Sequence, residues 1–280
     1  MLTHVKHVDF DFAKAAFAEG NQMISPDLFF IKNRKSTPSI SRIGVPFFTV
    51  NACCLCILNG HASYKVNLEN FDLRNRDVLL IPKDAILEIG SLFEDLEIRL
   101  CSLGERNTYD FPALVHIPDD AIWERVLLLL RLFESYLQEI DYESAVAVQN
   151  LIVIAVSKAM REAPERSGSD RHDHLQAFIG LIHRYGMKKR DVSFYAKEMS
   201  LTPNWLSHVV KSRSGQTVLE WIMDALIQHA KLYLVFTDFP VSRIALELGF
   251  TSGVDFSRVF KRKTRMTPQQ FRGSVQALPG

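Results

Sequence analysis

Cysteine is scarce in this chain of 280 residues, and three of its four cysteines stand close together. Cys53, Cys54 and Cys56 share one apolar run, whereas Cys101 lies far along the chain. A structural zinc site needs a second pair of ligands at a compatible spacing, and no such pair is evident. We therefore expect no metal and no cofactor, and we interpret the cysteines as buried, reduced thiols. A redox sensor and the lining of a ligand pocket are the alternatives.

Long hydrophobic runs are also lacking. The most apolar stretch, Ala145 to Ser157, contains Gln149 and Asn150 and is shorter than the roughly 20 residues that a membrane-spanning helix needs. The first residues carry charges such as Lys6 and Asp9, where a secretion signal would carry an apolar core. These patterns predict a cytoplasmic protein that does not enter a membrane.

The net charge of the whole chain is only +1, but the charges are unevenly distributed. From residue 171 to the end there are 16 lysines and arginines against 8 acidic residues, which gives a net charge of +8. The first 170 residues have 17 basic and 24 acidic residues, a net charge of −7. A basic C-terminal part indicates a polyanion as the partner of that part.

The first hundred residues have the pattern of short strands. Several runs are short, apolar and rich in strand-forming residues, or alternate polar and apolar with period two. Asn59 and Gly60 form a turn signal between two of these runs. The pattern predicts a small β-barrel or sandwich, with strands near 47–50, 55–58, 63–68, 78–82 and 96–100.

Two helices are predicted after these strands. Asp119 or Asp120 can cap a helix that runs to Ile140 with a wide apolar face. A second helix, from about Tyr142 to Met160, is apolar on most sides. Two such helices must pack on something. They either close the barrel or pair with a second copy of the chain, and the sequence favours neither.

A linker separates two predicted domains. The residues from Ala163 to Asp170 are proline, glycine, serine and charged types with little to bury, and the net charge changes sign at the same place. We therefore divide the chain into a first domain at 1–162, a linker at 163–173 and a second domain at 174–280.

The second domain contains two similar segments about 50 residues apart, Val192–Lys211 and Val241–Lys261. In each, a short helix ends at a turn and another helix begins. Thr202 and Ser252 are suitable N-caps for the second helix of each pair, and Gly249 can supply the second turn. This layout is typical of the helix-turn-helix, in which the second helix enters the major groove of DNA.

These residues resemble the DNA-binding domain of the AraC/XylS regulators over about 105 residues. The closest match runs from Ile244 to Arg272. It follows the family signature at Gly249-Phe250, Phe256, Phe260-Lys261 and Thr267-Pro268, and the first unit adds Tyr195-Ala196, Leu206-Ser207, Lys211 and Gly215. The first domain is similar to the cupin-type sensory barrels of that family by strand pattern alone. The histidine cluster that binds the metal of catalytic cupins is absent from the sequence.

The resemblance implies an α+β multidomain protein. Its first domain is expected to be a cupin-like β-barrel followed by two helices, and its second domain an all-α pair of helix-turn-helix units. The implied function is a non-enzymatic transcription regulator that reads two successive major-groove segments of promoter DNA. Control by a small effector or by a homodimer, and contact with RNA polymerase, are further implications. A cupin-type enzyme or an interaction protein tethered to DNA is the alternative.

Three positions depart from the family pattern. Leu226 stands where an arginine is usual on the connecting helix, so a common salt bridge is expected to be missing. Arg265 stands where glycine usually ends the last recognition helix in a left-handed conformation. Val254 replaces a polar residue near the start of that helix.

Helical spacing separates the outward residues of each recognition helix from the buried ones. Leu206, Val209 and Val210 are expected to be buried in the first helix, and Phe256, Val259 and Phe260 in the second. The predicted base contacts are Asn204, Ser207, His208, Val254, Asp255 and Arg258. Arg258 suits a bidentate contact with guanine, and Asn204 a contact with adenine.

A second group is predicted to hold the DNA backbone, which gives affinity without sequence preference. Its members are helix-start residues and the basic residues near the helix ends. They are Thr202, Trp205, Lys211, Ser252, Lys261, Arg262 and Lys263. Each of these positions also suits the solvated face of an ordinary helix. No effector-binding residue is predicted.

Overall fold

The computed structural model describes residues 22–25, 28–34, 43–93, 95–104, 111–162, 174–187 and 189–276. The chain divides into two compact units, one ending at Arg166 and the other beginning at Ser167. This boundary falls within the predicted linker at 163–173, whose own residues lie outside the described part of the chain.

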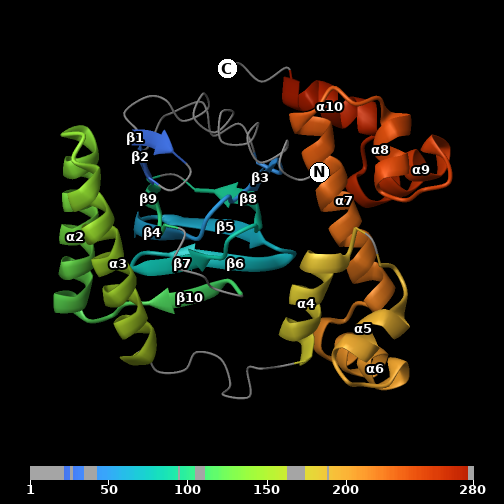
Figure 1. Ribbon diagram of the computed structural model, residues 1–280, viewed down its shortest axis with the longest axis horizontal. Helices are drawn as coiled ribbons and strands as arrows, with labels where there is room; N and C mark the ends of the chain where they lie inside the picture. Colours follow the sequence, from blue (N-terminus) through green and yellow to red (C-terminus); the bar gives the residue numbers. More distant parts are fainter. Residues whose placement is uncertain are drawn as a thin grey trace. The chain divides into compact units, whose positions relative to one another are not determined.

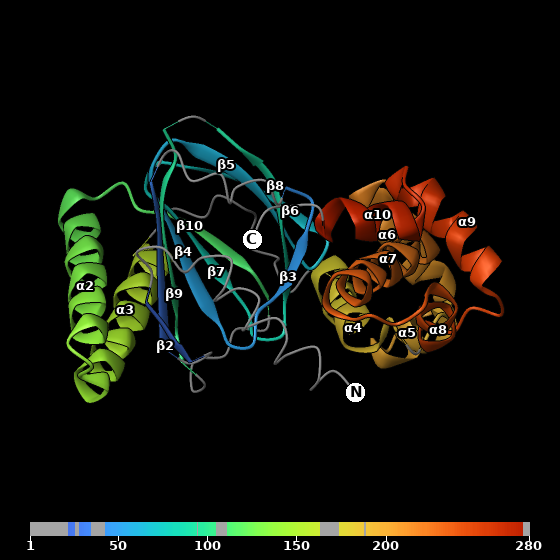
Figure 2. The same cartoon turned by 90° about the horizontal axis from the view of Figure 1, so that it is seen from above.

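The first unit contains two antiparallel sheets that face one another (Figure 2). The first sheet has the order β1 (Gln22–Ser25), β2 (Leu28–Arg34), β9 (Glu97–Ser102), β4 (Cys53–Asn59), β7 (Asp77–Ile81) and β10 (Ala113–His116). The second has the order β3 (Pro46–Phe48), β8 (Ile86–Leu92), β5 (His61–Val66) and β6 (Glu69–Arg74). The predicted α+β, two-domain fold class is confirmed. The strand pattern left a barrel or a sandwich open, and the described strands form two separate sheets.

The central strands β4 and β7 explain why the sequence shows continuous apolar runs there. Every residue of β7 is buried, as are the first five of β4, because the six-stranded sheet is covered on both faces. Strand β5 has only one buried face, so its burial alternates as the period-two pattern predicted. Gly60, with a φ of 80°, lies where the chain passes from β4 in one sheet to β5 in the other.

Helices α2 (Asp120–Gln138) and α3 (Tyr142–Glu162) cover the outer face of the six-stranded sheet (Figures 1 and 2). Asp119 caps α2 by accepting a hydrogen bond from the Ile122 amide at 2.8 Å. By length and composition alone, the 21 residues of α3 suffice to cross a membrane, so the expectation that this stretch is too short was wrong. Its inward side, including Val148, Ile152 and Val156, packs in one core with α2 and the sheet.

The outward side of these two helices is unusually apolar. Large apolar side chains remain at least a third exposed along both helices and the turn between them: Leu128, Leu132, Ile140, Tyr142, Val146, Leu151, Ile154 and Met160. Packing on the sheet therefore accounts for one face of the helix pair only. A second apolar face remains on the surface of this unit.

The second unit is entirely helical in its described residues. Its elements are α4 (His174–Tyr185), α5 (Val192–Glu198), α6 (Pro203–Ser214), α7 (Val218–Phe236), α8 (Val241–Glu247), α9 (Gly253–Thr264) and α10 (Pro268–Gln276). Helix α7 is buried over most of its length and passes between the α5–α6 pair and the α8–α9 pair (Figure 1). The two pairs are the predicted helix-turn-helix units.

Each pair is held on its own small core. Leu206 and Val210 are the buried residues of α6, and Phe256 and Phe260 those of α9. Val209 and Val259, which the helical spacing placed in the buried stripe, are only half-buried. Both lie at the edge of the buried stripe, where one helix face turns toward solvent.

Candidate nucleic-acid interface

Side-chain caps fix the start of each recognition helix. The Thr202 hydroxyl accepts a hydrogen bond from the Trp205 amide at 3.2 Å, and the Ser252 hydroxyl accepts one from the Asp255 amide at 3.0 Å. Both residues were expected as N-caps, and both expectations are confirmed. Because these hydroxyl oxygens satisfy the first free amides of the helices, α6 and α9 begin at defined residues.

Left-handed backbone conformations complete both units. The turn between the two helices contains Ser200 (φ 56°) in the α5–α6 pair and Gly249 (φ 70°) in the α8–α9 pair. The recognition helices end at Gly215 (φ 73°) and Arg265 (φ 66°) respectively. Arg265 therefore adopts the conformation that the missing glycine would favour, as the sequence indicated.

The outward face of α6 is polar and mostly uncharged. Asn204, Ser207 and His208 are exposed, as a surface that reads base edges requires. Trp205 is 40% exposed and meets the His174 ring edge-on, with 4.5 Å between ring centroids. Trp205 thus contacts α4 on one side and remains open to solvent on the other.

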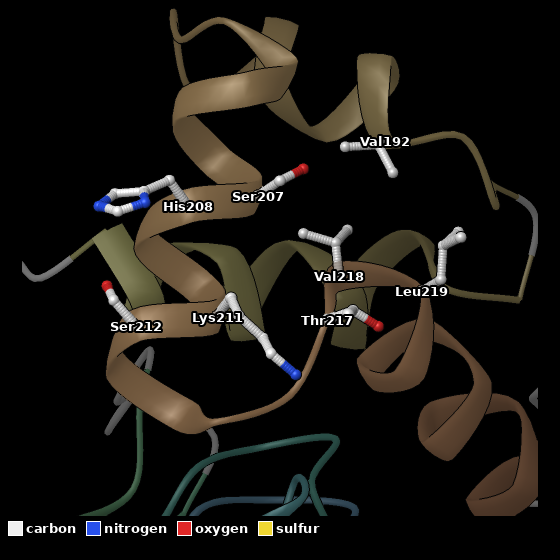
Figure 3. Close-up of a pocket in the computed structure, with 8 residues that line it drawn as sticks. All are labelled: Val192, Ser207, His208, Lys211, Ser212, Thr217, Val218 and Leu219. Atoms are coloured by element: carbon white, nitrogen blue, oxygen red, sulfur yellow. The ribbon is translucent and has the colours of Figure 1, made fainter.

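Beside this face lies a cleft of about 540 Å³ (Figure 3). It is lined by residues of α6 and by the first residues of α5 and α7: Val192, Ser207, His208, Lys211, Ser212, Thr217, Val218 and Leu219. Sequence reasoning missed the contribution of α7. The signal was available, because Thr217 and Glu220 have the spacing of a capping box and form one.

The outward face of α9 is charged at its centre and its end. Val254 is 68% exposed, and Arg258 is exposed with a weak ion pair to Asp255 at 3.4 Å. Asp255 also accepts a hydrogen bond from the Ser252 hydroxyl at 2.8 Å. The Asp255 carboxylate thus serves the start of its own helix, whereas the Arg258 guanidinium extends into solvent.

The basic residues at the end of α9 have different surroundings. Lys261 and Arg262 are exposed, as is Lys211 at the corresponding end of α6. Lys263 instead forms an ion pair with Asp224 of α7, with 2.6 Å between Nζ and Oδ1. A DNA phosphate would have to compete with Asp224 for the Lys263 ammonium group. Leu226, where the sequence lacks the usual arginine, is buried and carries no charge.

Arg190, which sequence reasoning did not single out, joins the two helix-turn-helix units. It precedes the Asp191 cap of α5, and its Nη2 donates a hydrogen bond to the main-chain oxygen of Leu248 at the end of α8. Its guanidinium lies 4.7 Å from the centroid of the Phe250 ring. No local pattern marks this residue, because its partners are 58 or more positions away.

The cysteine group lies in the N-terminal unit, on strands β4 and β9. All four thiols are buried and unbridged, and the Sγ atoms of Cys54 and Cys56 are 3.6 Å apart. Hydrogen bonds from Cys101 and Cys56 lower the pKa of Cys54, whereas burial raises the pKa of Cys53. In the described part of the chain, no three His, Cys, Asp or Glu side chains are grouped to hold a metal ion.

Comparison with known families matches this helical unit. Residues 195–274 match the family model described as a helix-turn-helix domain, which is of the AraC type. This stretch is therefore an AraC-type helix-turn-helix domain. The match begins at Tyr195 in α5 and ends in α10, so the AraC-type domain includes both helix pairs and the helix α7 between them.

Curated regulators are similar to part of this chain. The arabinose operon regulatory protein of Escherichia coli K12 is 36% identical over 86 residues, which is 31% of this chain and 30% of that protein. An uncharacterized HTH-type transcriptional regulator of Staphylococcus aureus MSSA476 is 48% identical over 155 residues, 54% of this chain and 21% of that protein. The matched stretch spans less than a third of the length of these relatives.

Solved structures are similar at lower identity. The DNA-binding domain of AdpA, solved in complex with a target DNA, is 22% identical with a TM-score of 0.35, over 38% of this chain and 95% of that chain. ToxT from Vibrio cholerae with a bound unsaturated fatty acid is 15% identical with a TM-score of 0.47, over 90% of this chain and 97% of that chain.

Proposed function

We propose that this chain is a sequence-specific, DNA-binding transcription regulator that reads two successive major-groove segments of a promoter. The observation that carries the proposal is the pair of capped recognition helices, α6 and α9, in one domain with a net charge of +8. Helices of this kind read base edges when the two segments are about 34 Å apart. Such a protein acts in the cytoplasm, on DNA and beside RNA polymerase, without a catalytic step of its own.

The proposed division of labour follows the exposure of the side chains. Arg258 reads a guanine, Asn204 and His208 read the other block, and Val254 rests on a thymine methyl group. Ser207 and Asp255 are secondary base contacts. Lys211, Lys261 and Arg262 hold phosphates, which contributes affinity that falls steeply with salt. At the helix starts, Thr202, Trp205 and Ser252 contact the DNA backbone.

The N-terminal unit, which contains the two sheets with α2 and α3, is proposed to control DNA binding through a small effector or through a homodimer. The exposed apolar face on α2 and α3 supports the homodimer, because a second copy of this face would cover Leu151 and Ile154. Replacement of Leu151 and Ile154 by glutamate is expected to convert the dimer to a monomer in sedimentation equilibrium. A wild-type protein that is monomeric at tens of micromolar contradicts the homodimer but leaves the DNA-binding proposal intact.

The test of DNA reading is selection of bound duplexes from a random pool, with wild type, Arg258→Ala and His208→Ala. The wild type is expected to enrich two sequence blocks about one helical turn apart, and each substitution is expected to relax one block only. Arg131→Ala is the matched control, because it removes an exposed arginine of α2, in the first unit. Salt-sensitive binding to every duplex, with no enriched motif, would contradict the proposal.

A further inference from the structure

The contact made by Arg190 crosses from one helix-turn-helix unit to the other. Arg190 directly precedes the N-cap of α5, and its guanidinium donates to the Leu248 carbonyl oxygen at the end of α8, where a helix leaves its last carbonyl oxygens without intrahelical donors. The guanidinium is also placed over the Phe250 ring, the second residue after Leu248. The Arg190 side chain thus holds the turn between α8 and α9 against the start of α5.

Gly249 lies between Leu248 and Phe250, and its lack of a side chain leaves space for the Arg190 guanidinium. A Cβ atom on Gly249 would lie 3.3 Å from Nη2 of Arg190, closer than side-chain atoms usually approach. The φ of Gly249 is 70°, so a side chain there is disfavoured by the backbone as well. The turn glycine of the second unit therefore has two roles: it permits the turn, and it leaves room for the guanidinium.

A second connection joins the ends of the two recognition helices. Asp224 of α7 accepts a hydrogen bond from Gln216 at 3.3 Å and pairs with Lys263 at 2.6 Å. Gln216 follows the last turn of α6, and Lys263 lies in the last turn of α9. Both carboxylate oxygens of Asp224 are used, one toward each unit. The connection lies on the shared helix α7, and Arg190 adds one that does not involve α7.

We propose that Arg190 is a positioning residue that fixes the spacing between the two half-sites, and that Asp224 with Lys263 assists it. The inference rests on the proposed function, because spacing has meaning only if both helices read DNA. Each unit keeps its own base preferences from its own helix. The angle and distance between α6 and α9 depend on how the two units are joined, so the joints determine which spacings fit the DNA.

The experiment measures binding to duplexes that carry both selected blocks at the best spacing, or with one base pair inserted or removed between them. Arg190→Ala is expected to lower affinity for the best spacing about tenfold, as loss of a charged hydrogen bond does. Affinity for the altered spacings is expected to change much less, so the discrimination between spacings falls. The bases selected within each block are expected to stay the same.

Two further arginine variants separate positioning from folding. Arg190→Lys keeps the charge and a donor but loses the planar contact with Phe250, and it is expected to restore part of the discrimination. Arg184→Ala is the matched control, because Arg184 is an exposed arginine of α4 in the same domain. Circular dichroism and a thermal melt check that each variant folds. If Arg190→Ala does not fold, Phe250→Leu tests the same joint with the hydrogen bond retained.

The ion pair is tested by exchange of its two charges. Asp224→Asn and Lys263→Met are each expected to broaden the accepted spacings. The double variant Asp224→Lys with Lys263→Asp restores the pair in reverse, and recovery of the wild-type spacing identifies Lys263 as a positioning residue. Failure of the exchange to restore spacing, with a uniform loss of affinity, assigns Lys263 to the DNA backbone and removes the ion pair from the proposal.

The outcomes separate the two proposals. A wild-type protein that selects two blocks, together with an Arg190→Ala variant of unchanged spacing preference, overturns this inference and leaves the proposed function standing. A wild-type protein that selects no motif overturns the proposed function, and this inference with it. Relaxed bases within a block in Arg190→Ala also contradict it, because a positioning residue does not read bases.

Discussion

The first helix-turn-helix pair buries Leu206 and Val210 on its recognition helix, whereas the second buries Phe256 and Phe260. Their outward faces also differ: α6 presents mainly uncharged polar groups, and α9 presents charged ones. What the two units share is the local chemistry of their ends, a hydroxyl cap at the start and a left-handed residue at the finish. The comparison teaches that the caps define this motif and that the core composition is free to vary.

The cores provide the largest expected difference between the units. Phe260 is fully buried and contacts the Phe256 and Phe271 rings, with centroids 5.7 Å away in both cases. Phe260→Ala is expected to lower the free energy of unfolding by about 3–5 kcal/mol. Val210→Ala removes two methyl groups and is expected to cost about 2 kcal/mol. Urea titration followed by circular dichroism measures both, and equal losses would show that the cores are equivalent.

Acid is expected to weaken the domain through His229 of α7. Burial, with a smaller contribution from His183 of α4, lowers the pKa of His229 to about 3. An unfolded histidine has a pKa near 6.5, so between these values the unfolded chain binds a proton that the folded chain does not. Stability is therefore complete above pH 6.5 and falls as the pH drops, by about 1.4 kcal/mol per pH unit.

The variant His229→Gln has no group that titrates at this position, so its stability is expected to depend less on pH between 6 and 4. Urea titrations of both proteins at several pH values measure the difference. An identical pH dependence would assign the acid sensitivity to other groups. His229 lies on α7, which both helix pairs share, so the effect is expected to fall on the whole helical unit.

The caps are expected to contribute equally in the two units. Thr202→Ala and Ser252→Ala each leave a helix-start amide without its acceptor, and each is expected to cost about 1 kcal/mol. Ser193→Ala is the control, because Ser193 is an exposed serine that does not cap α5. Thermal melts of the three variants measure the effect. A loss from Ser193→Ala as large as the other two would remove the special role of the caps.

The left-handed helix ends give the smallest expected effect, with opposite signs in the two units. Arg265→Gly relieves the strain of a side chain at a φ of 66° and is expected to stabilise the protein by about 0.5–1 kcal/mol. Gly215→Ala introduces that strain at the corresponding position and is expected to destabilise by a similar amount. A melting temperature that does not rise in Arg265→Gly would indicate that Arg265 makes a compensating contact.

Features that depend on neighbouring residues were predictable from the sequence. The caps Asp119, Thr202 and Ser252 act within three residues of themselves, and the left-handed end at Arg265 depends on its own backbone. The helical repeat found all the buried residues of α6 and α9, but it also predicted Val209 and Val259 as buried, and these are only half-buried. These signals are local because a helix satisfies its hydrogen bonds within a few residues.

Features that depend on distant partners were decided by the tertiary structure. The strands β1, β2, β6, β8 and β10 were not predicted, and the sequence left open whether the strands form a barrel or a sandwich of two sheets. A strand finds its hydrogen-bond partners in other segments, so its own residues specify pairing only weakly. The joints made by Arg190 with Leu248 and by Lys263 with Asp224 are of the same kind. The sequence by itself determined two capped recognition helices; only the folded domain decided how they are held relative to one another, because that arrangement depends on contacts between residues 39 and 58 positions apart.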